Sequence, residues 1–215
     1  MRIVIAGGHG QIALLLEEML AGRGDRPVGI VRNPAHVPDL EAVGAEAAVL
    51  DLEKATVEEV AAVVSGADAV VFAAGGGPGS GAARKETVDK GAAILLADAA
   101  ERAGVRRYLM VSSMGTDQAD PTSEDVFQVY LRAKAAADAD LRSRDLDWTI
   151  VQPGSLTNDP GTGRVTTDPA AEPKRVPRED VARVLLAALG EPATVRKQFL
   201  LFSGPSPVAE ALSTL

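Results

Sequence analysis

Tyr130 and Lys134 are the first and last residues of the segment YLRAK, and side chains of these types at this spacing can do proton chemistry. On a helix it places a phenol and an ammonium one turn apart on the same face. The ammonium favours the phenolate, so the pair could take up and release a proton near neutral pH. A helix tyrosine is also commonly a plain core or rim residue. Tyr130 is therefore a candidate catalytic acid or base, with Lys134 as a candidate catalytic residue beside it.

A glycine-rich turn, GGHGQIA, directly follows an apolar strand and precedes an amphipathic segment. Gly7 permits the tight turn, while Gly8 and Gly10 let backbone N–H groups approach a pyrophosphate. The small Ala13 lets the next helix pack close to the strand. The N-terminus of this helix then faces the anion. This context predicts a dinucleotide site rather than a plain βα turn. The candidate cofactor-binding residues are Gly7, Gly8, His9, Gly10, Gln11 and Ile12, with His9 alternatively a solvent-facing loop residue.

The residues after the second apolar strand, VRNP, indicate which dinucleotide is bound. Dinucleotide folds that prefer NAD place an acid there to hold the ribose 2′-hydroxyl. Arg32 stands there instead, followed by Asn33, and a guanidinium suits a 2′-phosphate. We therefore expect NADP (as NADPH), with NAD less favoured, unless Arg32 is only a solvated surface residue. Asp51 and the Leu52 amide are candidates for holding the adenine, although Asp51 could equally be an ordinary N-cap.

The elements that must position these residues alternate between strands and helices. Apolar runs with little polar alternation predict strands at residues 2–6, 27–31, 47–50, 69–73, 108–112, 147–152 and 198–202. Helical periodicity predicts helices at residues 11–21, 57–64, 83–103, 125–142 and 178–189. Continuous apolar strands are typical of a parallel sheet covered on both faces. We predict a Rossmann-type, doubly wound α/β fold in a single domain spanning residues 1–215.

Two segments lack this periodicity. Residues 153–177 are rich in Gly, Pro, Asp and Thr, and this length predicts a substrate-side loop or small lid. Residues 75–82, GGGPGSGA, form a second loop. Asp180 lies just after residues 153–177 and could be an acid in the first turn of a helix or a catalytic group.

Composition narrows the classes of function. The formal net charge of -8 argues against nucleic acid or an anionic membrane as the main partner. The chain has no cysteine and two histidines, so we expect no metal site. No apolar run approaches the roughly 18 residues of a membrane span, and the five-residue apolar strand at the N-terminus is too short for a signal-peptide core. These features predict a cytoplasmic protein. We expect a small-molecule substrate. The oligomeric state stays open.

The motifs together resemble the atypical short-chain dehydrogenase/reductase superfamily, and within it small NAD(P)-binding proteins similar to sugar-epimerase-like proteins and flavin/biliverdin reductase. The resemblance covers nearly the whole chain. Its carriers are GGHGQIA at Gly7, VRNP at Val31, LDL at Leu50, VVFAAG at Val70, YLMVSSMG at Tyr108, YLRAK at Tyr130, DWTIVQPGSLTNDPGTGRV at Asp147 and VPREDVARVL at Val176.

The resemblance implies roles for further residues. Ala73, Ala74 and Gly75 would line the cofactor ribose. Pro153, Gly154, Ser155 and Leu156 would pass near the nicotinamide, whose ribose Lys134 would also bind. Ser113 matches the family's catalytic serine, whose hydroxyl orients a substrate carbonyl or alcohol. Gln152 replaces the arginine usual in close relatives, which weakens any expectation of an anionic-substrate contact there.

These observations favour an NADP-dependent oxidoreductase that transfers hydride between NADPH and a small carbonyl, quinone or flavin-like acceptor. A redox-sensing regulator similar to the NmrA-like group, which binds NADP without turnover, is the first alternative. A nucleotide-sugar epimerase is the second, although the short C-terminal part leaves little room for a nucleotide-sugar. The presence of Ser113, Tyr130 and Lys134 together favours chemistry over sensing.

Overall fold

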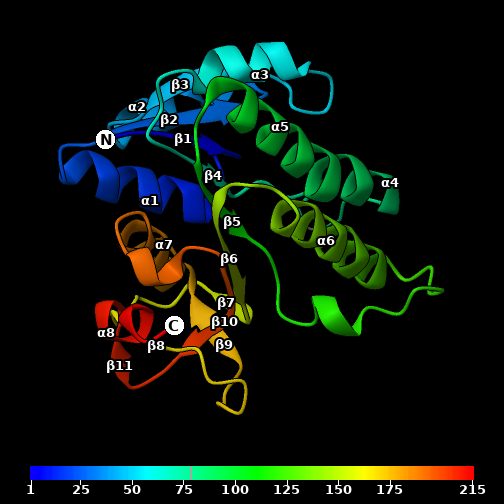
Figure 1. Cartoon of the computed structure of the whole chain (residues 1–215), viewed down its shortest axis with the longest axis vertical. Helices are drawn as coiled ribbons and strands as arrows, with labels where there is room; N and C mark the ends of the chain where they lie inside the picture. The colour runs from blue at the N-terminus through cyan, green and yellow to red at the C-terminus, as the bar shows by residue number, and fades with distance from the viewer. Residues whose placement is uncertain (78) are drawn as a thin grey trace.

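The computed structural model describes residues 1–77 and 79–215. Pro78, within the predicted loop at residues 75–82, lies outside the described residues. The principal strands are β1 (Arg2–Ala6), β2 (Arg26–Val31), β3 (Glu46–Val49), β4 (Ala69–Phe72), β5 (Arg107–Val111), β6 (Asp147–Pro153) and β10 (Lys197–Ser203). With β8 (Arg164–Thr166) and β11 (Ser206–Pro207), they form in the described chain one nine-stranded sheet, ordered β11-β8-β10-β6-β5-β4-β1-β2-β3 (Figure 1).

The seven principal strands run parallel, whereas β8 and β11 are paired antiparallel. The chain leaves β1 toward β2 and later returns to β4 on the other side of β1, so the strand order reverses at this point. In open α/β sheets a crevice forms there, outside the carboxyl ends of the strands, and ligands bind in it. The topology therefore directs attention to the ends of β1 and β4.

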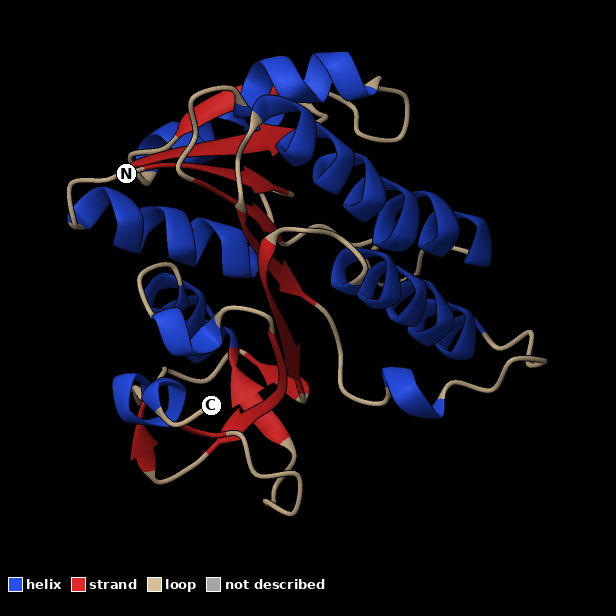
Figure 2. Ribbon diagram, viewed as in Figure 1, coloured by secondary structure: helices blue, strands red, loops and turns tan. Residues whose placement is uncertain are grey.

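Helices cover both faces of the sheet (Figure 2). They are α1 (Gln11–Gly22), α2 (Val37–Ala42), α3 (Val57–Val64), α4 (Ala82–Arg84), α5 (Ala93–Ala103), α6 (Val126–Arg142), α7 (Arg178–Ala188) and α8 (Val208–Ser213). Alternate residues of β1 point to opposite faces. Ile3 and Ile5 pack with α1 and α7, while Val4 and Ala6 pack with α3 and α5. Burial on both faces explains why the strands are continuously apolar.

The α/β prediction is confirmed, and all seven predicted strands lie within one residue of the observed bounds. The helix predicted at residues 83–103 is instead divided into α4, a π-helical segment (Lys85–Ala92) and α5. The segment at residues 153–177 is less irregular than expected, because it contains β7 (Ser155–Thr157), β8 and β9 (Arg175–Pro177). Three-residue strands are too short to show a periodicity in the sequence.

Helix α6, which carries Tyr130 and Lys134, has a defined start. The Asp125 carboxylate accepts the backbone N–H groups of Phe127 at 2.9 Å and Gln128 at 3.2 Å. These bonds satisfy donors that the helix itself leaves free, and a negative charge at this end also suits the helix dipole. The cap fixes the register of α6 and thus the face on which Tyr130 and Lys134 lie.

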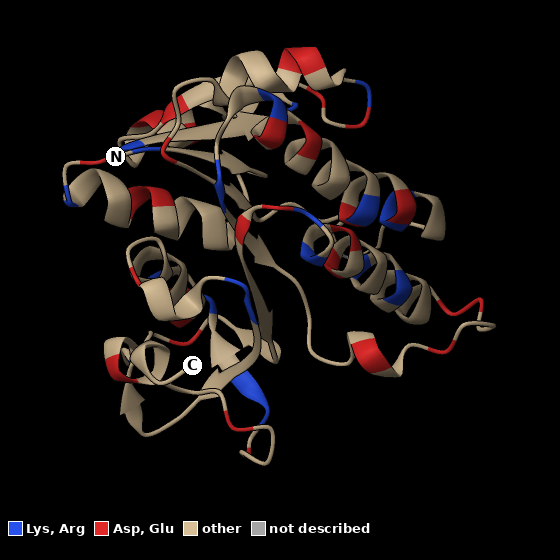
Figure 3. Cartoon of the chain, viewed as in Figure 1, with Lys and Arg blue, Asp and Glu red and all other residues tan. Residues whose placement is uncertain are grey.

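Acidic and basic residues are interspersed along α5 and α6 (Figure 3). None of the helices in the described part of the chain is both long and apolar enough to cross a membrane.

Candidate functional site

The turn between β1 and α1 has the backbone that its glycines predict. Gly7 has a φ of 82°, and a Cβ there would lie 2.6 Å from the Cα of Ala74. The Gly10 N–H donates to the Gly7 carbonyl at 2.8 Å, which closes the turn. Gly10 gives α1 no side-chain cap, and the first turn of α1 has no acid. The N-terminal N–H groups of α1 are thus available to an anion.

Gly8 serves packing, and its role in the approach of a pyrophosphate stays a prediction. Its N–H donates to the Ile30 carbonyl at 3.0 Å, so it is already used by β2. A Cβ on Gly8 would lie 2.6 Å from the Cα of Gly29. Glycine is required here because the turn and β2 touch backbone to backbone.

A first cavity of about 290 Å³ opens beside this turn, at the carboxyl ends of β1 to β4. Nine predicted cofactor-binding residues line it: Gly7, His9, Gly10, Arg32, Asp51, Leu52, Ala73, Ala74 and Gly75. The lining also includes His36, Glu53 and Arg84, which the sequence analysis missed. Gly8, Gln11 and Asn33 do not line it, and Asn33 instead accepts the Ala35 N–H at 3.0 Å.

Glu53 organises the basic side chains of the first cavity. Its carboxylate accepts from Arg32 at 3.2 Å, from Arg84 at 3.2 Å and from the Thr87 hydroxyl at 2.7 Å. The Thr87 hydrogen bond, with help from Arg84, lowers the pKa of Glu53 below its ordinary value. Arg32 is half-exposed at the cavity. Glu53 thus gathers two guanidiniums at this cavity, and guanidiniums suit an anionic ligand.

His9 and His36 form a stacked pair at the same cavity. Their ring centroids are 3.6 Å apart, and His9 Nε2 lies 2.8 Å from a carboxylate oxygen of Asp39. The stack joins the glycine turn to the segment after β2. His36 could not be found from the sequence, because nothing in the spacing indicates that these two loops meet.

A second cavity, of about 590 Å³, adjoins the first. Ala73, Ala74 and Gly75 line both cavities. Ile12, Tyr130, Lys134 and Leu156, which the sequence also predicted, line the second. The glycine turn and the pair Tyr130 and Lys134 therefore border two cavities that share a wall.

Lys134 contacts the segment that lines both cavities. It is buried, and its ammonium donates to the carbonyls of Val111 at 3.1 Å and Ala74 at 3.5 Å. It also pairs with the buried Asp89 carboxylate at 3.5 Å. Asp89 in turn accepts the Gly76 N–H at 3.0 Å. Asp89 has no signal in the sequence, because it lies in the π-helical segment where the periodicity predicts a regular helix.

Ser112, rather than Ser113, lines the second cavity. The Ser113 hydroxyl donates to the Met114 carbonyl at 3.0 Å, and its catalytic role stays a prediction. Ser112 donates to the buried Asp138 carboxylate at 2.8 Å. Burial raises the pKa of Asp138 to about 6, which the Ser112 hydrogen bond opposes. Gln152 donates to Thr116 at 2.7 Å and belongs to this buried polar group.

The segment predicted to pass near a nicotinamide touches the cavities only through Leu156. Pro153 and Ser155 lie in strands, and the N–H groups of Gly154 and Ser155 donate to the carbonyls of Leu201 and Lys174, each at 3.0 Å. A Cβ on Gly154 would lie 2.5 Å from that Lys174 oxygen. The N–H groups of Gly154 and Ser155 are thus already used in hydrogen bonds within the protein.

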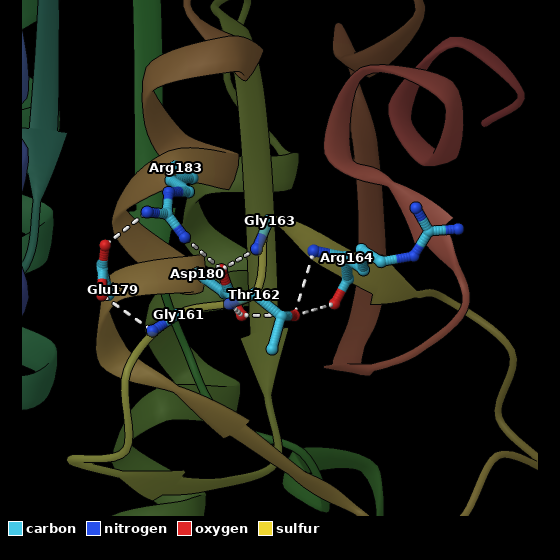
Figure 4. Close-up of polar contacts among 7 residues, drawn as sticks. All are labelled: Gly161, Thr162, Gly163, Arg164, Glu179, Asp180 and Arg183. Atoms are coloured by element: carbon cyan, nitrogen blue, oxygen red, sulfur yellow. Dashed lines mark hydrogen bonds and ion pairs between the residues drawn. The ribbon is translucent and has the colours of Figure 1, made fainter.

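Asp180, at the start of α7, fastens the loop at residues 161–163 (Figure 4). Its carboxylate is fully buried and accepts the N–H groups of Thr162 at 2.9 Å and Gly163 at 2.8 Å. Arg183 donates to it at 3.0 Å. These contacts give Asp180 a structural role.

Replacing Asp180 by alanine should lower the free energy of unfolding by about 3 kcal/mol, because buried N–H groups lose a charged acceptor. Urea denaturation measures this change. Asp159→Ala, an exposed acid in the same loop, should change the free energy by less than about 0.5 kcal/mol. Similar small effects of both substitutions would contradict the structural role.

Comparison with known proteins agrees with this geometry. A family model described as NAD(P)H-binding matches residues 7–192. The chain belongs to this NAD(P)H-binding family. Among curated proteins similar to it, "Uncharacterized sugar epimerase YhfK" of Bacillus subtilis is 36% identical over 216 residues, covering 100% of both chains.

Solved structures similar to this NAD(P)H-binding protein extend over its whole length. "Putative NAD-dependent epimerase/dehydratase from Bacillus halodurans" is 36% identical, with a TM-score of 0.92 and 100% of both chains covered. The oxidoreductase ylbE from Lactococcus lactis is 27% identical, with a TM-score of 0.87, covering 100% of this chain and 96% of its own. These similar proteins are thus named as an oxidoreductase and as epimerase-type proteins.

Proposed function

We propose that the chain is an NADPH-dependent reductase of a small carbonyl, quinone or flavin-like acceptor. The observation that carries this proposal is that Tyr130 and Lys134 line a cavity sharing three wall residues with the cavity at the glycine turn. The Tyr130 phenol, which can donate a proton, therefore lies next to a cavity that can hold a dinucleotide.

The residues present fit the cofactor. The uncapped N-terminus of α1 and the turn at Gly7 would hold the pyrophosphate. Arg32, with His36 and Arg84, would face the 2′-phosphate, and Asp51 and Leu52 would face the adenine. When bound, NADPH supplies a hydride from nicotinamide C4.

The chain supplies the proton. Reduction of an acceptor carbonyl would open its C=O π bond and place negative charge on its oxygen. The Tyr130 phenol would give its proton to that oxygen and later regain one from solvent. Lys134, fixed by Asp89, would orient the nicotinamide ribose beside Tyr130. A hydroxyl at the end of β5, from Ser112 or Ser113, would orient the acceptor.

An acceptor panel tests the function. Purified protein with NADPH and a set of carbonyls, quinones and flavins should oxidise one NADPH per two-electron reduction of one of them. The two alternatives give other results. A redox-sensing regulator would bind NADPH without turnover, and an epimerase would convert a nucleotide-sugar with no net use of cofactor.

Arg32 should determine the choice of dinucleotide. Wild-type protein should bind NADPH at least about tenfold more tightly than NADH, because the guanidinium pairs with the 2′-phosphate. Arg32→Ala should weaken NADPH binding and leave NADH binding unchanged, so that most of the preference for NADPH is lost. Isothermal titration calorimetry measures both affinities. Arg26→Ala is the matched control, since Arg26 lies at the other end of β2 and pairs with Glu46. Equal wild-type affinities for both dinucleotides would refute NADP preference.

A further inference from the structure

The carboxylate of Glu53 lies among the side chains that would hold the 2′-phosphate. Glu53, Arg32 and Arg84 all line the first cavity. Both guanidiniums reach the same oxygen, Glu53 Oε2, through one outer nitrogen each, Nη1 of Arg32 and Nη2 of Arg84. The other oxygen, Oε1, accepts the Thr87 hydroxyl. The carboxylate is therefore already bound by the two arginines that an anionic ligand of this cavity would need.

The contacts between Glu53 and the arginines are of a kind that a phosphate can replace. Guanidiniums bind carboxylates and phosphates most strongly through two parallel N–H groups, at about 2.7–2.9 Å. Each arginine instead gives Glu53 one hydrogen bond of 3.2 Å. In addition, the Nε of Arg84 is buried and has no hydrogen-bond partner in the described part of the chain. A buried donor without a partner is costly, so a ligand with several acceptor oxygens would satisfy N–H groups that one carboxylate does not reach.

Glu53 would also oppose a phosphate by its charge. The hydrogen bond from Thr87, with help from Arg84, holds the pKa of Glu53 below its ordinary value, so the carboxylate is ionised at neutral pH. An ionised carboxylate repels a phosphate brought to the same guanidiniums. Asp51 also lines the cavity, but its carboxylate pairs with Lys54 at 3.7 Å instead. A ribose with a free 2′-hydroxyl meets neither the competition for the guanidiniums nor the repulsion.

We infer that Glu53 competes with the 2′-phosphate of NADP(H) for Arg32 and Arg84, and so limits the preference of the protein for NADP(H) over NAD(H). In the free protein Glu53 holds both guanidiniums. When NADP(H) binds, the guanidiniums turn from the carboxylate to the phosphate, a cost that NAD(H) binding does not carry. The inference rests on the cofactor site of the proposed function and adds a residue that acts against its selectivity.

Glu53→Gln tests the inference, because it removes the charge and keeps the length of the side chain. NADP⁺ and NAD⁺ are matched probes, since they differ only by the 2′-phosphate. Isothermal titration calorimetry at neutral pH should show that the variant binds NADP⁺ about tenfold more tightly than wild-type protein does. NAD⁺ affinity should stay within about twofold, because the turn at Gly7 and the adenine contacts are unchanged. Binding of NAD⁺ also reports that the variant is folded.

Two further variants separate the contributions. Glu46→Gln is the matched control, since Glu46 pairs with Arg26 at the opposite end of β2 from Arg32, and it should leave both affinities unchanged. Glu53→Gln combined with Arg32→Ala should gain less NADP⁺ affinity, relative to Arg32→Ala, than Glu53→Gln gains relative to wild type. The gain is smaller because only Arg84 is then released.

Weaker NADP⁺ binding by Glu53→Gln would overturn the inference, because Glu53 would then hold the arginines in place for the phosphate. An equal gain for NADP⁺ and NAD⁺, or no change in either affinity, would overturn it as well. A selective gain for NADP⁺ would support the inference even if wild-type protein oxidised NADPH with no acceptor, a result that refutes the proposed reductase alone.

Discussion

Tyr130→Phe is expected to lower kcat for acceptor reduction by about 10²- to 10⁴-fold, the usual contribution of a positioned proton donor. The substitution removes only the hydroxyl. The ring stays beside Phe127 and Lys85, so the cavity keeps its shape. NADPH affinity should stay within about twofold of wild type. Steady-state kinetics with the best acceptor of the panel, together with an NADPH titration, measures both quantities.

The second tyrosine of the chain provides the control. Tyr108 is fully buried in β5 and donates to the Ala93 carbonyl at 3.0 Å, away from both cavities. Tyr108→Phe should reduce the free energy of unfolding by about 1 kcal/mol, because the carbonyl loses its hydroxyl partner, and leave kcat unchanged. If Tyr130→Phe keeps wild-type kcat, the acid is another group and the mechanism proposed for Tyr130 fails.

The features that could be predicted from the sequence are local ones. The turn at Gly7 depends on a strand, a tight turn and a helix that are adjacent in the chain, and so does the placement of Arg32 after β2. Tyr130 and Lys134 share one helix face, which a spacing of four residues is enough to indicate. These residues accordingly line the two cavities.

The residues that sequence reasoning missed come from connections that meet only in the folded chain. Glu53 and Arg84 follow different strands, and they approach Arg32 because β2, β3 and β4 end at one edge of the sheet. The choice between Ser112 and Ser113 was also beyond the sequence. Successive side chains at the end of a strand point to opposite sides. A shift of one residue therefore decides whether the serine hydroxyl faces the cavity or points away from it.

Glu17 is a further residue whose environment only the fold reveals. The sequence LLLEEML offers two adjacent glutamates in α1, and the structure buries Glu17 completely while leaving Glu18 exposed. The carboxyl fills the space left by two glycines: a Cβ on Gly29 would lie 2.6 Å from its Oε1, and one on Gly8 3.0 Å. Neither carboxyl oxygen has a hydrogen-bond partner in the described chain. Burial raises the pKa of Glu17 from 4.5 to about 8.

This burial makes stability depend on pH. Between about pH 4.5 and 8 the folded protein retains a proton on Glu17 that the unfolded chain releases. The free energy of unfolding therefore falls as the pH rises through this window, and the stabilisation is fully present only below it. From pH 5 to pH 8 the loss attributable to Glu17 should be on the order of 3 kcal/mol.

Glu17→Gln should remove this pH dependence, because glutamine occupies the same volume and has no proton to lose. Urea denaturation at pH 5 and pH 8 should show the variant gaining on the order of 3 kcal/mol over wild type between the two conditions. The change with pH is the decisive quantity, since any packing penalty of the amide adds equally at both values. Glu18→Gln, one residue along on the exposed side of α1, should follow wild type at both pH values. A Glu17→Gln variant that loses stability in parallel with wild type would show that Glu17 is ionised in the folded protein, and that α1 and β2 open enough at Gly8 and Gly29 to solvate its charge.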